Sequence, residues 1–171
     1  MNLHIRFARP ADAPLIHRFI CELAEYEKEP DAVEVDPPTL AAQMAQARPP
    51  FECLIAEQRD AGADAPRPLG FALFFHNYST WRGRHGLYLE DLFVPPAHRG
   101  QGVGKALLTR LGAIAVERGC GRMEWSVLDW NTPAIRFYES LGARPMDEWT
   151  TWRLTGPALD ALGAAGRGVG A

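Results

Sequence analysis

The sequence has little of what membrane, secreted or nucleic-acid-binding proteins need. No apolar run approaches the roughly 20 residues of a membrane-spanning helix, and no signal-peptide apolar region precedes the first strand-like segment. We therefore expect a cytoplasmic protein without a membrane partner. A net charge of -3 is not the excess of Lys and Arg that binding to a phosphate backbone requires, which argues against nucleic acid. The same charge is compatible with a small cationic partner.

Cysteine is also scarce. Cys21, Cys53 and Cys120 are odd in number and far apart, so they form neither a disulfide framework nor a metal-ligand pattern. Each lies in an apolar segment, which is typical of buried, unreactive thiols. We therefore expect no metal site.

Length and patterning predict one α/β domain over residues 1–155. A chain of 171 residues is long enough for one core, and no internal repeat is present. The tail at 156–171 is rich in Gly and Ala, so we expect it to be frayed. Apolar patterns predict strands at 3–7, 51–57, 69–77, 87–94, 122–128 and 145–155. Helices are expected after Asp12, after Asp36, from Val103 for about four turns, and from Asn131 to Leu141.

The segment 87–94 is apolar apart from two adjacent carboxylates, Glu90 and Asp91. Its near-continuous apolar run predicts a strand that is covered on both faces. Carboxylates are costly to bury there, which favours a functional role, and the alternative is a buried ion pair with an arginine. Adjacent strand residues point to opposite faces, so only one of the two can face a given cleft unless the strand bulges.

Three glycines, Gly100, Gly102 and Gly104, lie at the entrance of the helix that starts at Val103. They let a ligand approach the backbone, and the free N–H groups of a helix N-terminus bind phosphate. A P-loop is excluded because Arg99 and Ala106 replace its first Gly and its Ser or Thr. A dinucleotide fingerprint is excluded because Lys105 or Leu107 stands where its third Gly belongs. The segment instead resembles the acyl-CoA pyrophosphate loop of the GNAT acetyltransferase superfamily.

An acyl transfer from such a loop to an amine needs a base and an acid. An alkylamine with a pKa near 10.4 is only about one part in 10³ neutral at pH 7, so the amine must be deprotonated. Glu90 and Asp91 are candidates for the base. Tyr138, whose phenol has a pKa near 10, is a candidate to protonate the leaving thiolate. His98, beside the loop, is the alternative acid.

Many short motifs together resemble the diamine (spermidine/spermine-type) N-acetyltransferase family within GNAT. The resemblance covers residues 3 to about 155. The motifs are Tyr26-Glu27, Trp81-x-Gly83, Leu87-Tyr-Leu-Glu-Asp-x-Phe-Val94, Arg99-Gly-x-Gly-x-Gly104, Trp130-Asn-x-Pro133, Phe137-Tyr138, Gly142-Ala143 and Trp152-Arg153.

The resemblance implies a fold, a co-substrate and residue roles. It implies a GNAT fold with a mixed, mainly antiparallel sheet of six or seven strands, splayed beside the central strand and with helices on both faces. It also implies acetyl-CoA as co-substrate, a small cationic amine as substrate and a homodimer. Glu90 becomes the base acting through water and Tyr138 the acid, while Tyr26, Glu27 and Asp91 belong to the amine pocket. The residues implied for acetyl-CoA are Leu92, Phe93, Val94, Arg99, Gly100, Gln101, Gly102, Val103, Gly104, Lys105, Asn131, Thr132, Pro133 and Ala134.

Two questions stay open at this point. The family places an acidic cluster before its final Trp-Arg, whereas here Asp147-Glu-Trp-Thr-Thr151 displaces and partly replaces those acids. Diamines, polyamines and thialysine-like or other amines are therefore all possible substrates. A non-catalytic acyl-CoA-binding module on the same fold is the alternative function, although the presence of both Glu90 and Tyr138 favours the enzyme.

Overall fold

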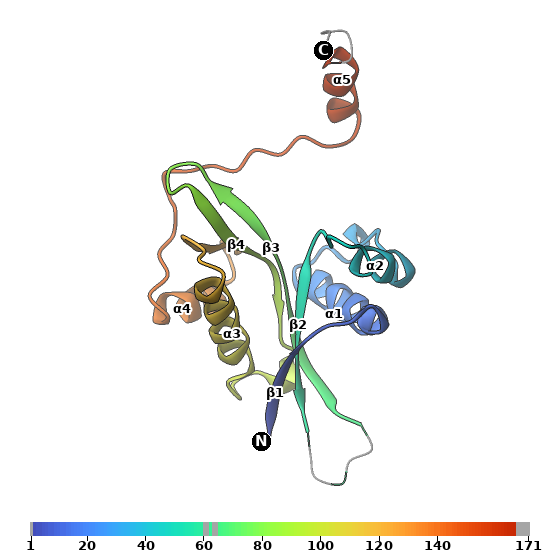
Figure 1. Ribbon diagram of the computed structural model, residues 1–171, viewed down its shortest axis with the longest axis vertical. Helices are drawn as coiled ribbons and strands as arrows, with labels where there is room; N and C mark the ends of the chain where they lie inside the picture. Colours follow the sequence, from blue (N-terminus) through green and yellow to red (C-terminus); the bar gives the residue numbers. More distant parts are fainter. Residues whose placement is uncertain (1, 60–61, 63–64, 167–171) are drawn as a thin grey trace. The chain divides into compact units, whose positions relative to one another are not determined.

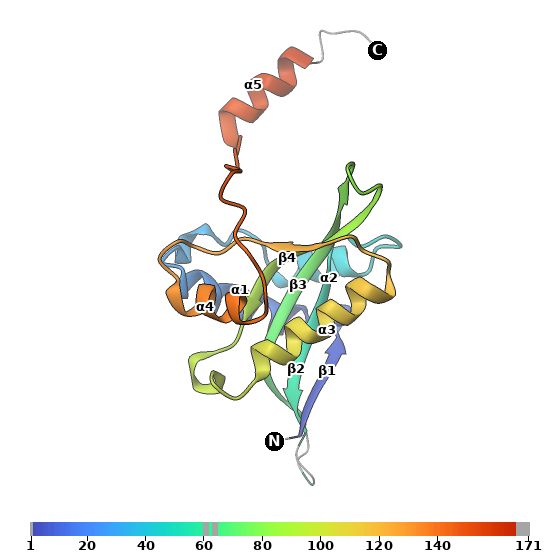
Figure 2. The same ribbon diagram turned by 90° about the vertical axis from the view of Figure 1, so that its left-hand side faces the viewer.

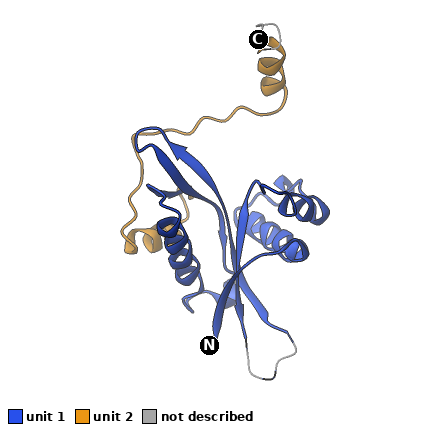
Figure 3. Cartoon of the chain, viewed as in Figure 1, with its two compact units in different colours: residues 1–126 blue, residues 127–171 orange. Residues whose placement is uncertain are grey.

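The structure is a computed structural model that describes residues 2–59, 62 and 65–166. The chain divides into two compact units, and the first, residues 1–126, is built on a five-stranded sheet (Figure 3). The strand order follows the sequence, with three antiparallel pairs from β1 to β4 and a parallel pair of β4 with β5. This confirms the mixed, mainly antiparallel fold, but the described chain has five strands where we expected six or seven. The strands are β1 (Leu3–Phe7), β2 (Glu52–Gln58), β3 (Arg67–Ser79), β4 (Arg84–Phe93) and β5 (Met123–Trp125).

Helices cover both faces of this sheet, as expected. Helices α1 (Ala13–Tyr26) and α2 (Pro37–Met44) lie on one face and α3 (Val103–Glu117) lies on the other (Figures 1 and 2). The expected strand 87–94 is β4, and it is an inner strand because β3 and β5 flank it. Three short 3-10 helices, η1 (Pro10–Asp12), η2 (Pro30–Ala32) and η3 (Pro96–His98), connect these elements.

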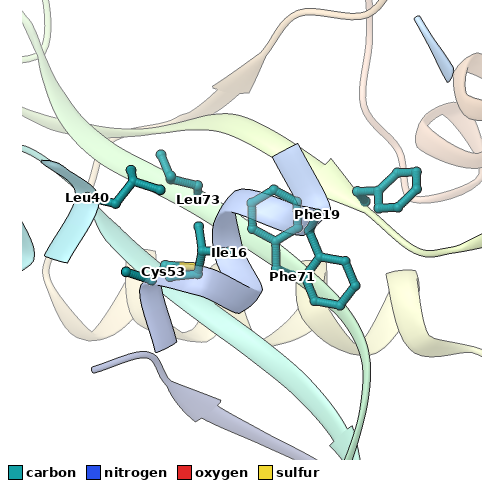
Figure 4. Packing of buried hydrophobic residues seen from close by; sticks show 8 residues of the cluster. Ile16, Phe19, Leu40, Cys53, Phe71 and Leu73 are labelled. Carbon is teal, nitrogen blue, oxygen red and sulfur yellow. The ribbon is translucent and has the colours of Figure 1, made fainter. Parts of the chain in front are cut away.

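Aromatic packing fixes α1 on the sheet. Phe19 of α1 stacks on Phe71 of β3 with 5.5 Å between ring centroids, and it lies 6.3 Å from the ring of Phe93 at the end of β4. Figure 4 shows this cluster between helix and strands. The buried members are Ala13, Ile16, Phe19, Leu40, Cys53, Phe71, Leu73 and Phe93. The end of α1 and the end of β4 are therefore held by one core.

The opposite face is packed by α3. Its buried side chains recur at intervals of three and four along the helix, as the sequence predicts. The buried residues of α3 are Val103, Leu107, Leu108, Leu111, Ile114 and Ala115. None of the described helices is long and apolar enough to cross a membrane.

The two expected helix caps differ in outcome. Asp36 caps α2, because its carboxylate accepts the N–H of Thr39 at 2.9 Å. Asp12 makes no such bond to α1. Its carboxylate instead accepts the N–H of Arg9 at 2.7 Å and pairs with the Arg6 side chain at 2.8 Å. The reason is the 3-10 turn η1, which lies where the sequence predicts a turn: Asp12 is its third residue and its carboxylate is turned back to the N–H of Arg9.

The second unit, residues 127–171, contains α4 (Thr132–Ser140) and α5 (Gly156–Gly166). Gly142 follows α4 with φ of 85°, the left-handed conformation in which glycine commonly closes a helix. The strand expected at 145–155 does not form. A strand needs a neighbour, and the large apolar side chains of this segment are exposed, Trp152 at 92%. Residues 156–166, where we expected fraying, form α5 without a buried residue.

Candidate active site

A β-bulge in β4 sets the direction of its two carboxylates. Leu89 pairs with Phe74 and Asp91 pairs with Leu73, so Glu90 is an extra residue without a partner on β3. Residues directly opposite each other lie on the same face of a sheet. Asp91 therefore shares the face of Leu73, under α1 and α2, although in a regular strand it would share the α3 face with Leu89.

The pairing of β4 with β5 stops at the same point. The parallel register runs from Leu87 with Met123 to Leu89 with Trp125, and the hydroxyl groups of Tyr88 and Ser126 lie 3.0 Å apart. Strand β4 then continues to Phe93 without a partner on β5. The splay that the family resemblance implies would begin at this position. Glu90 is the first residue past the paired segment.

Three carboxylates gather near this bulge. Asp91 is half-buried, and its burial, followed by the charges of Glu90 and Glu27, raises its pKa to about 6. Burial also raises the pKa of Glu27. Among the ion pairs of the described residues, none involves any of these three carboxylates. The alternative of a buried ion pair with an arginine is therefore not supported, and the group can attract a cationic ligand.

The C-terminal end of α1 supplies Tyr26 and Glu27. The helix ends at Tyr26, Lys28 adopts φ of 67°, and the N–H of Glu29 donates to the carbonyl of Ala24 at 2.9 Å. The charge of Glu27, in this closing turn, is one of the causes that raise the pKa of Asp91. Two of the predicted amine-pocket residues, Tyr26 and Glu27, thus come from the end of α1, and the third, Asp91, comes from β4.

The glycine loop presents open backbone at the start of α3. Gly100 and Gly102 have φ of 72° and 83°, which favour glycine, and a Cβ built on either would meet no atom within 4 Å. The first N–H groups of α3, from Val103 to Lys105, have no intrahelical acceptor. The helix dipole adds positive potential there. The anion site that the sequence predicts would be formed by these groups.

The other residues expected at this loop differ in what they can offer a ligand. Phe93 is only 4% exposed, so its side chain belongs to the core. Leu92 and Val94 are half-buried, and the side chain of Gln101 donates to the carbonyl of Ala97 at 3.2 Å. Arg99 donates from Nε to the carbonyl of Val94 at 2.9 Å, and its guanidinium lies 4.5 Å from the ring centroid of Tyr26. The sequence analysis missed this contact because the two residues are far apart in the chain.

The second unit carries the remaining predicted residues on one helix. Asn131 caps α4, since its side chain accepts the N–H of Ala134 at 3.4 Å, and Thr132 and Pro133 form the first turn. Tyr138 is half-buried near the end of α4, with its ring centroid 5.5 Å from that of Phe137. The alternative acid His98 lies in the first unit at the end of η3 and is half-buried. No group of three or more His, Cys, Asp or Glu side chains suited to a metal ion occurs among the described residues.

Comparison with known proteins gives consistent matches. The model of the Acetyltransferase (GNAT) family matches residues 18–143. Thialysine N-epsilon-acetyltransferase of Bos taurus is 39% identical over 163 residues, which cover 92% of this chain and 95% of that protein. Spermidine/spermine N(1)-acetyltransferase-like protein 1 of Homo sapiens is 38% identical over 88% of this chain and 22% of that longer protein. An integron cassette protein of V. cholerae superimposes with a TM-score of 0.76 at 25% identity, covering 95% of this chain and 98% of that one.

The raised pKa of Asp91 predicts an unusual pH dependence of stability. Between its ordinary value of 3.8 and about 6, the folded protein binds more protons at Asp91 than the unfolded chain does. The contribution of this carboxyl to stability therefore falls as the pH rises through that range. We expect Asp91→Asn to raise the free energy of unfolding by about 1–3 kcal/mol at pH 7.5 and to change it little at pH 4.

Urea denaturation at the two pH values measures this difference. Asp160→Asn is the matched control, because Asp160 is exposed on α5 and should change stability little at either pH. An Asp91→Asn variant that is less stable than the parent at pH 7.5, or equally shifted at both pH values, would contradict the electrostatic interpretation.

Proposed function

Because this chain belongs to the acetyltransferase (GNAT) family and its close relatives are N-acetyltransferases, we propose that it transfers an acetyl group from acetyl-CoA to a primary amine of a small cationic substrate. The observation that carries the proposal is the group of Glu27, Glu90 and Asp91 at the point where β4 leaves β5. These carboxylates lack an ion-pair partner among the described residues, and the glycine loop follows on the same stretch of chain. Attraction of a cation by such a group is the physical basis for the choice of substrate.

In the proposed reaction the neutral amine attacks the thioester carbonyl, forming a C–N bond and releasing the thiolate. Glu90 acts as the base through a water molecule, since it is exposed at the bulge and remains accessible to solvent. Asp91 and Glu27 hold the cationic substrate, with Tyr26 forming part of the same pocket. Tyr138 protonates the leaving thiolate. The base is needed because the substrate amine is mostly protonated, and the acid neutralises the thiolate as the C–S bond breaks.

The acetyl-CoA pyrophosphate is proposed to bind the free N–H groups of residues 100–105. The left-handed conformations of Gly100 and Gly102 and the open space beside them support this assignment. The exposed Lys105 adds a positive charge in the first turn of α3. The backbone of residues 92–94 is a further proposed contact of acetyl-CoA, and the family resemblance assigns residues 131–134 of the second unit to acetyl-CoA as well.

The proposed substrate is a diamine, a polyamine or a lysine-like amine. The names of the two relatives include both possibilities, a thialysine side chain and a polyamine-like substrate. A thiol-release assay with acetyl-CoA and a panel of diamines, polyamines, lysine analogues and arylamines tests the proposal. We expect turnover of the cationic amines to fall as salt is raised. Equal turnover of neutral arylamines without salt dependence would contradict it, and acetyl-CoA binding without thiol release would favour the non-catalytic module.

The loop assignment predicts a selective effect of Gly102→Val. A bulky side chain at φ of 83° would project into the space where the backbone meets the pyrophosphate. We expect acetyl-CoA binding, measured by calorimetry, to weaken at least severalfold. Gly119→Val is the matched control, because Gly119 has φ of 66° and equally open space but lies beyond the other end of α3. Similar backbone strain in both variants with weaker binding only in the first supports the assignment, and normal binding by Gly102→Val rejects it.

The proposed acid predicts a large kinetic effect of Tyr138→Phe. The change keeps the ring and removes one hydroxyl group, so loss of a general acid should lower turnover by about 10²- to 10⁴-fold. Binding of acetyl-CoA and thermal stability should change far less. A more acidic leaving thiol needs less protonation and should partly rescue the variant. The control is Tyr78→Phe, at an exposed tyrosine on β3, which should leave turnover unchanged. If chemistry is rate-limiting and Tyr138→Phe turns over within twofold of the parent, Tyr138 is not the general acid.

We also propose that the chain forms a homodimer. The exposed apolar side chains of the second unit support this, because Met146, Trp149 and Trp152 are 65%, 67% and 92% exposed. Exposed side chains of this size favour burial against another surface. Sedimentation equilibrium at micromolar concentration measures the assembly, and a stable monomer would reject it.

A further inference from the structure

Arg99 is held by the protein itself at the glycine loop. Its Nε donates to the carbonyl of Val94 at 2.9 Å, and its guanidinium lies 4.5 Å from the ring centroid of Tyr26. The same guanidinium lies 5.9 Å from the ring centroid of Phe93. We infer that Arg99 is a positioning residue, which fixes the glycine loop to the end of α1 so that the amine pocket and the acetyl-CoA site depend on one shared contact.

The partners of Arg99 are well fixed. Phe93 is buried and packs against Phe19 in the core, so the end of β4 does not move freely. Tyr26 is in the last turn of α1, whose buried face is anchored on the same core. The guanidinium therefore connects the end of β4 with the end of α1: its Nε–H donates to the carbonyl of Val94, and its central carbon lies over the ring of Tyr26.

The glycine loop needs such a connection. Gly100 and Gly102 both adopt left-handed conformations, which glycine reaches without strain but does not enforce. The preceding turn is closed by the N–H of His98 on the carbonyl of Pro95 at 2.8 Å and by the N–H of Arg99 on Pro96 at 3.2 Å. The Arg99 side chain extends this order to the residue directly before the first glycine.

The consequence for function rests on the proposed acetyl-CoA site. If Arg99 bound a phosphate mainly through its charge, lysine would substitute well for it, and Tyr26 would not affect acetyl-CoA binding. If Arg99 positions the loop, lysine fails, because an ammonium cannot stack on the Tyr26 ring and keep the guanidinium's bond to Val94. Loss of the Tyr26 ring should then weaken acetyl-CoA binding, although Tyr26 belongs to the amine pocket.

Calorimetry of acetyl-CoA binding without amine distinguishes the two roles. We expect Arg99→Gln, Arg99→Lys and Tyr26→Leu each to weaken binding by about three- to tenfold. Tyr26→Phe keeps the ring and should weaken binding less than Tyr26→Leu does. The double variant Arg99→Gln with Tyr26→Leu should be close to either single variant, since both remove the same contact. Arg110→Gln is the matched control for loss of one positive charge on α3, and it should have little effect.

Two results would overturn this inference. In the first, Tyr26→Leu binds acetyl-CoA as tightly as the parent. In the second, Arg99→Lys binds acetyl-CoA as tightly as the parent while Arg99→Gln binds it much more weakly. Thermal unfolding confirms that each variant is folded, and if Tyr26→Leu is not, the comparison of Arg99→Lys with Arg99→Gln decides. A parent protein that does not bind acetyl-CoA would refute the proposed function instead.

Discussion

The alternation of side chains along β4 is the constraint on which the rest of the site depends. An uninterrupted strand would place Glu90 and Asp91 on opposite faces of the sheet. The extra residue at Glu90 interrupts this alternation, and Asp91 then shares the face of Leu73 and Phe93, against which α1 packs. Glu27 directly follows the last residue of α1. The same position marks the end of pairing with β5. One local irregularity therefore gathers the charges and leaves β4 without a second neighbour.

The gathered carboxylates lower stability in exchange for electrostatic attraction. Asp91 is removed from water beside two other acids, and no positive side chain among the ion pairs of the described residues offsets that cost. Carboxylates that leave water are normally paired, so the half-buried Asp91 and Glu27, without an ion-pair partner beside the exposed Glu90, are better suited to a ligand than to the core. The large apolar cores on both faces of the sheet tolerate this local cost.

Local sequence patterns predicted the helices and strands that are determined by the spacing of apolar residues within one segment. The run from Leu87 to Val94 and the periodic residues of α3 gave a strand and a helix, because their burial follows from spacing alone. The extra residue at Glu90 was not predictable, since it depends on the register with β3. The contact of Arg99 with Tyr26 joins positions far apart in the chain and leaves no local signal. Residues 145–155 have a strand pattern, but a pattern alone does not provide a pairing partner.

The bulge also has a consequence for how this fold and its chemistry can change over evolution. Because Glu90 has no partner on β3, losing that one residue would let Leu89 and Asp91 follow each other with their present partners unchanged. The hydrogen-bonded sheet and the cores on both sides would survive such a deletion, whereas the exposed carboxylate would disappear. Deletion of one codon, that of Glu90, could therefore remove the proposed catalytic base from a descendant protein that keeps the fold.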